Sequence, residues 1–355
     1  MLDELSSLDA GPLEVVLPLR MPLRLLRIVA LLPLLAVPET RSGDIRFAGM
    51  RLGTSWYVFS ATLYKLMAEE MPPGTRLEVL AKGGGIANPL LVDRGKADVA
   101  LANRATAVWA RDGHPLVYGG RKHEGLCVLV GGLNKVPVSV LVREDYLKRT
   151  GYKSLPEIFS GENPVRVVMK PKGSSVPVVA DLILDALGTS RDAIRRNGGR
   201  IIQVSAKQIP DVMRNGQADV YFEAMPKGHP GVTQVSLTVP VRFFGLPEKV
   251  LARLARIGLE TMEIPAGTWK GQAGAFKAVD LGTVILTHQR LPDRVAYLFT
   301  KTICEEREAL ARAHKAWSGF DPEQAWRPEN CGIALHPASE RYYRERGWIG
   351  EDRDE

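Results

Sequence analysis

The chain has 355 residues, of which 45% are hydrophobic and 25% charged, an ordinary composition for a globular protein long enough to form two domains or lobes. This composition excludes a collagen-like protein, a largely disordered protein and a disulfide scaffold. The net charge of +7 comes from basic residues scattered along the chain. We therefore expect no nucleic-acid partner and at most a mild attraction for anions.

The N-terminal extension, residues 1–43, contains a segment with the layout of a secretory signal, centred on about residues 21–38. Three arginines precede an apolar run, Ile28–Val37, that is shorter than the roughly 20 residues a membrane-spanning helix needs. No Ala-x-Ala site follows the run, Pro33 interrupts it, and Met21 is an alternative start. We expect export to the periplasm, with an uncleaved membrane anchor or a buried helix as the alternatives.

From residue 44 the chain alternates strand and helix patterns. An apolar strand pattern at 44–50 leads into Gly53-Thr54-Ser55, whose hydroxyls are suited to capping the amphipathic helix that follows. A second strand (76–83), a short helix (88–95) and a buried strand beginning at Ala97 come next. This β-α-β-α-β order predicts a parallel sheet with helices on its faces.

Two segments join this unit to a second one. The string "VPVSVLV" (136–142) predicts one crossing strand, and "AVDLGTVILTH" (278–288) predicts the return. We therefore assign residues 44–134 and 278–355 to lobe I and residues 135–277 to lobe II.

The second unit repeats the first. Its Gly173-Ser174-Ser175 turn again follows a strand and begins a helix, and the string Gly-x-Ala-Asp-Val occurs in both "RGKADVALAN" (94–103) and "NGQADVYFEA" (215–224). Gly95 and Gly216 in these strings suit the left-handed residue that ends a helix. The repeat predicts two similar α/β lobes.

Residues 291–314 predict one long helix packed on lobe I, because apolar residues recur at helical spacing. Three cysteines are too few and too dispersed for a disulfide framework or a structural zinc site. Cys127 lies in a buried strand pattern, whereas Cys304 and Cys331 either pair in an oxidising compartment or stay reduced.

Ligands of open parallel sheets bind beyond the carboxyl ends of the strands. There the loops at 53–55 and 173–175 offer N–H groups at helix starts, which favour a carboxylate or a phosphate, although plain helix capping is the alternative. A buried strand in each lobe also ends near a charged residue, Arg104 or Glu223. This pair predicts either a grip on a zwitterion such as an amino acid or a salt bridge between the lobes.

The sequence contains no catalytic or cofactor motif. The string "KGGGIANP" (82–89) lacks the third glycine of a dinucleotide-binding loop because Asn88 replaces it. No P-loop, His-Glu-x-x-His or Gly-x-Ser-x-Gly string occurs, and the six histidines are dispersed. We expect no enzyme activity, no cofactor and no metal.

Three segments resemble the TAXI family, the solute receptors of TRAP-type (tripartite ATP-independent periplasmic) transporters: "DRGKADVALAN" (93–103), "IPAGTWKGQ" (264–272) and "LHPASERYYRERG" (335–347). The resemblance covers about residues 44–349. It implies a type II periplasmic-binding-protein fold, in which two mixed α/β lobes enclose a ligand cleft. It also implies delivery of a small carboxylate-bearing solute, an amino acid or an organic acid, to a permease driven by an ion gradient. We expect a monomer.

The resemblance further implies which residues bind the solute. Its loop motifs correspond to Gly53, Thr54, Ser55, Trp56 and Tyr57, to Gly84, Gly85 and Asn88, to Asn103 and Arg104, and to Gly173, Ser174 and Ser175. Gly85 replaces a serine, Asn103 a glutamine and Arg104 a small polar residue, while Glu223 stands where the family is apolar. These departures indicate a solute that differs from the family's usual ligand.

Two other functions are compatible with the same sequence. A ligand-sensing module would bind a solute and signal to another protein without transport. An enzyme on the same bilobed scaffold would convert its ligand. A neighbouring transporter gene would favour the receptor, and recovery of an unchanged ligand would exclude the enzyme.

Overall fold

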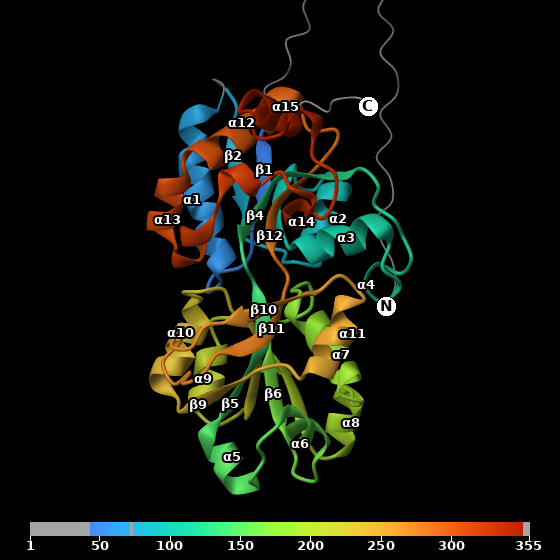
Figure 1. The fold of residues 1–355 in the computed structure, drawn as a ribbon, viewed down its shortest axis with the longest axis vertical. Coiled ribbons are helices and arrows are strands. Elements are labelled where there is room, and N and C mark those ends of the chain that lie inside the picture. Colours follow the sequence, from blue (N-terminus) through green and yellow to red (C-terminus); the bar gives the residue numbers. More distant parts are fainter. Residues whose placement is uncertain (1–42, 72–73, 351–355) are drawn as a thin grey trace, which may run out of the picture. The chain divides into compact units, whose positions relative to one another are not determined.

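The computed structural model describes residues 43–71 and 74–350. Within these residues the chain forms two β-sheets, each flanked by helices (Figure 1). The segment expected to be a signal or anchor, at about 21–38, lies outside the described residues. Across the described ranges, no helix has both the length and the apolar character needed to cross a bilayer.

The first sheet belongs to lobe I and has the strand order β2-β1-β3-β12-β4. Strand β1 pairs in parallel with β2 and β3, and β12 pairs antiparallel to β3 and β4. The strands are β1 (Ile45–Ala48), β2 (Leu77–Leu80), β3 (Val99–Ala102), β4 (Leu126–Asn134) and β12 (Thr283–His288). The helices are α1 (Ser55–Glu70), α2 (Ala87–Asp93), α3 (Arg104–Asp112), α4 (Pro115–Tyr118), α12 (Asp293–Glu305), α13 (Arg307–Ala313), η1 (Lys315–Gly319), η2 (Pro322–Gln324), α14 (Pro328–Cys331) and α15 (Pro337–Glu345).

The second sheet belongs to lobe II and runs β10-β11-β5-β8-β6-β7, with β9 paired to β5. The strands are β5 (Pro137–Arg143), β6 (Arg166–Met169), β7 (Arg200–Gln203), β8 (Val220–Ala224), β9 (Val241–Phe244), β10 (Glu260–Ile264) and β11 (Phe276–Asp280). The helices are α5 (Glu144–Thr150), α6 (Leu155–Ser160), α7 (Val176–Ala186), α8 (Arg191–Arg196), α9 (Ile209–Arg214), α10 (Pro230–Thr238) and α11 (Glu248–Ala255). The predicted two-lobed α/β fold is therefore confirmed.

The repeated units have the same topology. Strand β6 pairs in parallel with β7 and β8, as β1 does with β2 and β3. Gly95 and Gly216 adopt left-handed backbone angles, with φ of 62° and 67°, directly after α2 and α9. The β-α-β-α-β order is confirmed in the first unit, whereas the second unit has an additional helix, α8, between α7 and β7. The two glycine helix ends are confirmed.

The aspartate of the repeated string has the same role in each lobe. Asp98 accepts hydrogen bonds from the backbone N–H of Arg46 at 2.8 Å and from its guanidinium at 3.1 and 3.2 Å. Asp219 accepts the corresponding bonds from Arg166 at 2.9, 2.9 and 2.6 Å. In each lobe the aspartate thus fixes the start of the central strand against its parallel neighbour.

Two short crossings connect the lobes, as predicted. The chain leaves the first sheet between β4 and β5 at Lys135-Val136 and returns between β11 and β12 at Leu281-Gly282. Strand β11 belongs to the second sheet, so the predicted boundary at residue 277 falls inside this strand. Asp280 links the crossings because its Oδ1 accepts hydrogen bonds from the N–H of Val136 at 2.6 Å and that of Gly282 at 3.0 Å.

The predicted single helix at 291–314 is wrong, because two helices, α12 and α13, fill this range. The chain leaves helical geometry at Glu306, with φ −90° and ψ 25°. The turn allows Leu310 of α13 to enter the same apolar core that receives Phe299 and Ile303 of α12. The helical spacing of apolar residues continues through this turn, because both helices bury their apolar faces in one core.

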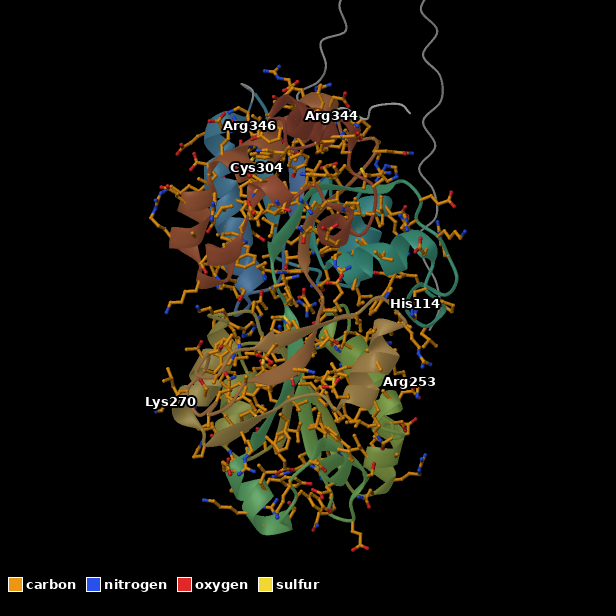
Figure 2. All side chains as sticks on the ribbon, in the orientation of Figure 1. His114, Arg253, Lys270, Cys304, Arg344 and Arg346 are labelled. Atoms are coloured by element: carbon orange, nitrogen blue, oxygen red, sulfur yellow. The ribbon has the colours of Figure 1, made fainter. Side chains whose placement is uncertain are left out.

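The three cysteines are buried and free, so Cys304 and Cys331 do not form a disulfide. The sulfur of Cys304 lies 3.9 Å from the hydroxyl of Tyr343, in the first lobe (Figure 2). The sulfur of Cys331 lies 3.2 Å from the carbonyl of Ala325. Burial raises the pKa of both thiols to about 12, which keeps them protonated at neutral pH.

Candidate functional site

A cavity of about 40 Å³ lies between the lobes, beyond the carboxyl ends of the central strands. Several residues predicted to bind the solute line it: Thr54, Ser55, Trp56, Gly85, Asn103, Ser174 and Ser175. The other lining residues are Met50, Val136, Lys170, Val176, Ala224, Pro226 and His229. Both lobes and one crossing segment therefore line a single small space.

Two helix N-termini meet at this cavity. Thr54 caps α1, since its hydroxyl oxygen accepts a hydrogen bond from the N–H of Tyr57 at 3.2 Å, and Ser55 begins the helix. In the other lobe Ser175 and Val176 occupy the start of α7. The partial positive charge of both helix ends therefore falls on the same space, which favours an anionic group.

The lobes touch directly beside the cavity. The N–H groups of Ile86 and Ala87 donate to the carbonyl oxygen of Gly173 at 3.2 and 3.3 Å. Gly84 has a φ of 149°, and a Cβ atom on it would lie 2.6 Å from that same oxygen. A glycine is required here because the two loops approach too closely for a side chain.

Some predicted residues lie beside the cavity without lining it. Asn88 is fully buried and donates to the carbonyls of Gly49 at 2.9 Å and Leu101 at 2.7 Å. Its Oδ1 accepts a bond from the N–H of Gly84 at 2.9 Å. Asn88 therefore holds the glycine loop in place. Gly53 precedes the cap of α1 with a φ of 86°, and Tyr57 lies in its first turn.

The structure does not bring Arg104 and Glu223 together. Arg104 Nη2 lies 3.0 Å from Glu260 Oε1, an ion pair between lobe I and lobe II. Glu223 is fully buried behind the cavity, with its Oε1 2.5 Å from Lys170 Nζ. Arg104 therefore forms a salt bridge between the lobes, as one of the two alternatives predicted, but its partner is Glu260 and not Glu223.

Two polar residues of the cavity, Lys170 and His229, were not predicted. Lys170 directly follows β6, so the rule that ligands lie beyond strand ends was sufficient to find it. His229 caps α10, with Nδ1 accepting from the N–H of Val232 at 3.3 Å. Burial, followed by the nearby charge of Lys170, holds the pKa of His229 well below its ordinary value. It is therefore neutral at neutral pH.

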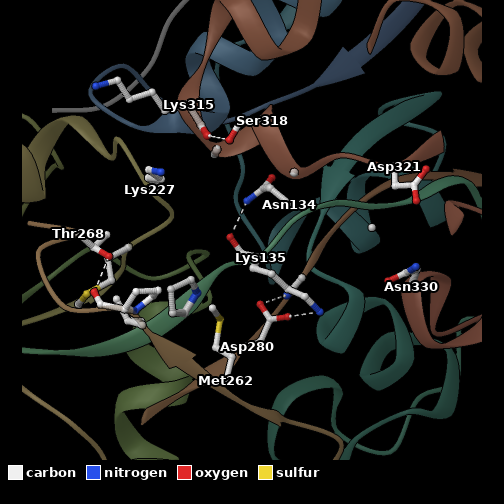
Figure 3. A pocket seen from close by; sticks show the side chains of 18 of the residues that line it. Asn134, Lys135, Lys227, Met262, Thr268, Asp280, Lys315, Ser318, Asp321 and Asn330 are labelled. Atoms are coloured by element: carbon white, nitrogen blue, oxygen red, sulfur yellow. Dashed lines mark hydrogen bonds and ion pairs between the residues drawn. The ribbon is translucent and has the colours of Figure 1, made fainter. Parts of the chain in front are cut away.

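A second, larger space of about 580 Å³ is lined by residues of both lobes and of both crossings (Figure 3). We call it the hinge groove. Two segments border both spaces, with successive residues on alternate sides. In the first, Val136 lines the cavity, and Lys135 and Pro137 line the groove. In the second, Ala224 and Pro226 line the cavity, and Met225 and Lys227 line the groove. These two segments thus separate the two spaces. Arg104, Lys315 and Asp280 also line the groove.

No metal site is evident within residues 43–71 and 74–350. No group of three or more histidine, cysteine, aspartate or glutamate side chains there is arranged to hold an ion. The arrangement is suited to binding: it offers helix ends, hydroxyls, an ammonium group and a neutral imidazole around one small space.

A family model described as NMT1-like matches residues 48–347, which include both lobes and both crossings. The chain belongs to the NMT1-like family. Its match spans every residue that lines the cavity.

Three solved structures similar to this NMT1-like protein have low sequence identity. MatC from Rhodopseudomonas palustris, solved with malate, is 12% identical, with a TM-score of 0.50 over 86% of this chain and 97% of that chain. A protein from Bordetella bronchiseptica RB50 is 13% identical, with a TM-score of 0.49 over 87% of this chain and 90% of that chain. The alkanesulfonate-binding protein SsuA from Xanthomonas axonopodis pv. citri, bound to MOPS, is 13% identical, with a TM-score of 0.40 over 85% and 83%. The match to MatC supports a shared fold.

Proposed function

We propose that this NMT1-like protein is an extracytoplasmic receptor that captures a small carboxylate-bearing solute, an amino acid or an organic acid. The observation that carries the proposal is the small cavity lined by both lobes, where two helix N-termini converge. Such an arrangement holds a carboxylate with backbone N–H groups and buries it when the lobes close. MatC, which has a similar fold, was solved with malate, a carboxylate-bearing solute.

In this proposal the predicted residues divide into two groups. Ser55, Gly85, Asn103, Ser174 and Ser175 contact the solute, with Thr54 and Trp56 beside them. Asn88, Gly84 and Gly173 shape the loops that close around it, as do Gly53 and Tyr57 next to the cap of α1. Arg104 acts in the contact between the lobes, and Glu223 acts through Lys170.

We further propose that the receptor works in the periplasm as a monomer and delivers the solute to a TRAP-type permease, as a member of the TAXI family. The segments "DRGKADVALAN", "IPAGTWKGQ" and "LHPASERYYRERG" support this partner. Uptake of a labelled solute into vesicles that carry the neighbouring permease should require the receptor and an ion gradient, and should continue without ATP. Uptake that depends on ATP hydrolysis would contradict the TRAP assignment.

Thermal unfolding of the full chain tests the receptor function. Amino acids, mono-, di- and tricarboxylates, keto acids and aromatic acids are added in turn. A ligand at 100 times its Kd should raise the free energy of unfolding by about 2.7 kcal/mol. Absence of a shift with every acid would contradict a carboxylate receptor.

The variant Gly85→Ala tests whether the solute binds in the cavity. The added methyl carbon would lie 2.3 Å from Asn103 Oδ1 and 2.9 Å from Ser175 Cβ, so it should abolish the ligand-induced shift. Gly274→Ala is the matched control, because a Cβ there meets nothing within 4 Å. An unchanged shift in Gly85→Ala would place the solute elsewhere.

A further inference from the structure

Three polar atoms at the cavity lack a hydrogen-bond partner among the described residues. They are Ser55 Oγ, Asn103 Oδ1 and His229 Nε2, and each residue is only 2% exposed. Buried polar atoms are nearly always paired, because an unpaired one loses its bonds to water without replacement. All three residues line the cavity, so a polar molecule bound inside it would supply the missing partners.

The neighbouring bonds fix what each of these atoms can do. Asn103 Nδ2 donates to the carbonyl of Gly282 at 3.0 Å, which leaves Oδ1, a pure acceptor, as the unpaired end of the amide. His229 Nδ1 accepts from the N–H of Val232 at 3.3 Å. In the neutral imidazole the proton is then on Nε2, so this atom is a donor. The hydroxyl of Ser55 can donate or accept a hydrogen bond.

The acceptor lies beside the part of the cavity that favours a carboxylate. A Cβ built on Gly85 would approach Asn103 Oδ1 to 2.3 Å and Ser175 Oγ to 3.0 Å, so both oxygens border the same small volume. Ser175 precedes α7, whose N-terminus favours an anion. A molecule that satisfies both must carry an acid group and a hydrogen-bond donor on adjacent atoms.

The charge of the cavity supports a single acid group. Lys170 is the charged side chain that lines it, and its ammonium lies 2.5 Å from the carboxylate of Glu223. The pair is therefore nearly neutral as a unit. A second carboxylate on the solute would find no unbalanced cation among the lining residues.

We infer that the solute is a monocarboxylic acid with an O–H or N–H group on the carbon next to the carboxylate, and that Asn103 Oδ1 accepts this hydrogen bond. The inference rests on the proposed function, since it presumes that a carboxylate occupies the helix ends. It separates hydroxy and amino acids from keto acids, because a ketone oxygen would face the lone pairs of Asn103 Oδ1.

Titration calorimetry of the full chain tests the inference with matched acids. Glycolate is compared with acetate, and lactate and alanine are compared with propionate and pyruvate. We expect at least one donor-bearing acid to bind about tenfold or more tightly than its donor-free partner, which is the discrimination expected of one hydrogen bond to a buried acceptor. Comparing the affinities of glycolate and lactate with that of alanine distinguishes a hydroxyl donor from an amino donor.

The outcomes separate the inference from the proposed function. Equal affinities within each matched set would overturn the inference and leave a carboxylate receptor. Absence of binding by every acid, with the chain folded, would overturn both. Tighter binding of pyruvate than of lactate would also overturn the inference, because it would require a donor at Asn103.

Asn103→Ala tests the residue itself. The ratio of lactate to propionate affinity should fall to about one, while the affinity for propionate changes by less than about threefold. Asn134→Ala is the matched control, since Asn134 is also a buried lobe I asparagine with an unpaired Oδ1 but lines the hinge groove. Retention of the ratio in Asn103→Ala would assign the acceptor to another group. The acid series on the unmodified chain remains decisive if this variant does not fold.

Discussion

Lys170 and Glu223 form an ion pair behind the solute cavity, with Nζ and Oε1 2.5 Å apart and exposed fractions of 5% and 0%. The carboxylate also accepts hydrogen bonds from the N–H of Ala224 at 2.7 Å and from the hydroxyl of Tyr221. Burial raises the pKa of Tyr221 well above its ordinary value, so this hydroxyl stays a donor. The network fixes the lysine at the cavity wall.

Glu223→Gln should lower the free energy of unfolding by about 3–5 kcal/mol, because it leaves a buried ammonium without its counter-charge. Urea unfolding at neutral pH measures the loss. The double variant Lys170→Met with Glu223→Gln should recover part of it, since the unpaired charge is then absent. A single variant that unfolds at the same urea concentration as the parent would show that the pair contributes no stability.

Acid should destabilise the protein through His229. Burial holds its pKa well below 6.5, so below about pH 6.5 the unfolded chain binds a proton that the folded chain does not. The free energy of unfolding should therefore fall as the pH drops, by up to about 1.4 kcal/mol per pH unit for this one group. His229→Asn, which keeps a side-chain acceptor for the helix cap, should reduce this slope. A slope that stays the same in the variant would assign the acid sensitivity to other groups.

The two aspartates of the repeated string should differ in their effect on stability. Asp219 is 2% exposed, whereas the side chain of Asp98 is 26% exposed. Asp219→Ala should cost about 1–3 kcal/mol because it removes a buried acceptor from the backbone N–H of Arg166, and Asp98→Ala about 1 kcal/mol because water replaces its bonds. Urea unfolding of both variants tests this order. Equal losses would mean that burial does not set the strength of these pairs.

Asp280→Ala should loosen the crossings between the lobes. It leaves the N–H groups of Val136 and Gly282 without their acceptor, at a cost of about 1–3 kcal/mol. Hydrogen exchange at these two amides should become faster. Asp321→Ala is the control: its Oδ1 accepts from the N–H of Glu323 in its own turn, so exchange at the crossings should not change.

Local patterns were sufficient to predict most of the fold. The capping hydroxyl of Thr54, the helix-ending glycines and the repeated string are each determined by neighbours close in sequence, so they could be recognised before the structure. The break at Glu306 was missed because α12 and α13 bury their faces in one core, so the apolar period continues through the turn.

The candidate site was predictable where it lies in repeated loops or directly beyond the end of a strand. Ser55 and Ser175 start corresponding helices, so the repeat places them on the same cavity. The partner of Arg104 could not be predicted, because Glu260 reaches it from an edge strand of the other lobe. The role of His229 depends on burial by residues distant in sequence, which no local pattern reports.

The wall between the cavity and the hinge groove links their sizes in opposite directions. Val136 borders one space, and its neighbours Lys135 and Pro137 border the other. Any rotation of the lobes about this wall that widens the cavity would therefore narrow the groove. A reporter dye in the groove would then register a change in a cavity that it never touches, and a molecule wedged in the groove would oppose widening of the cavity.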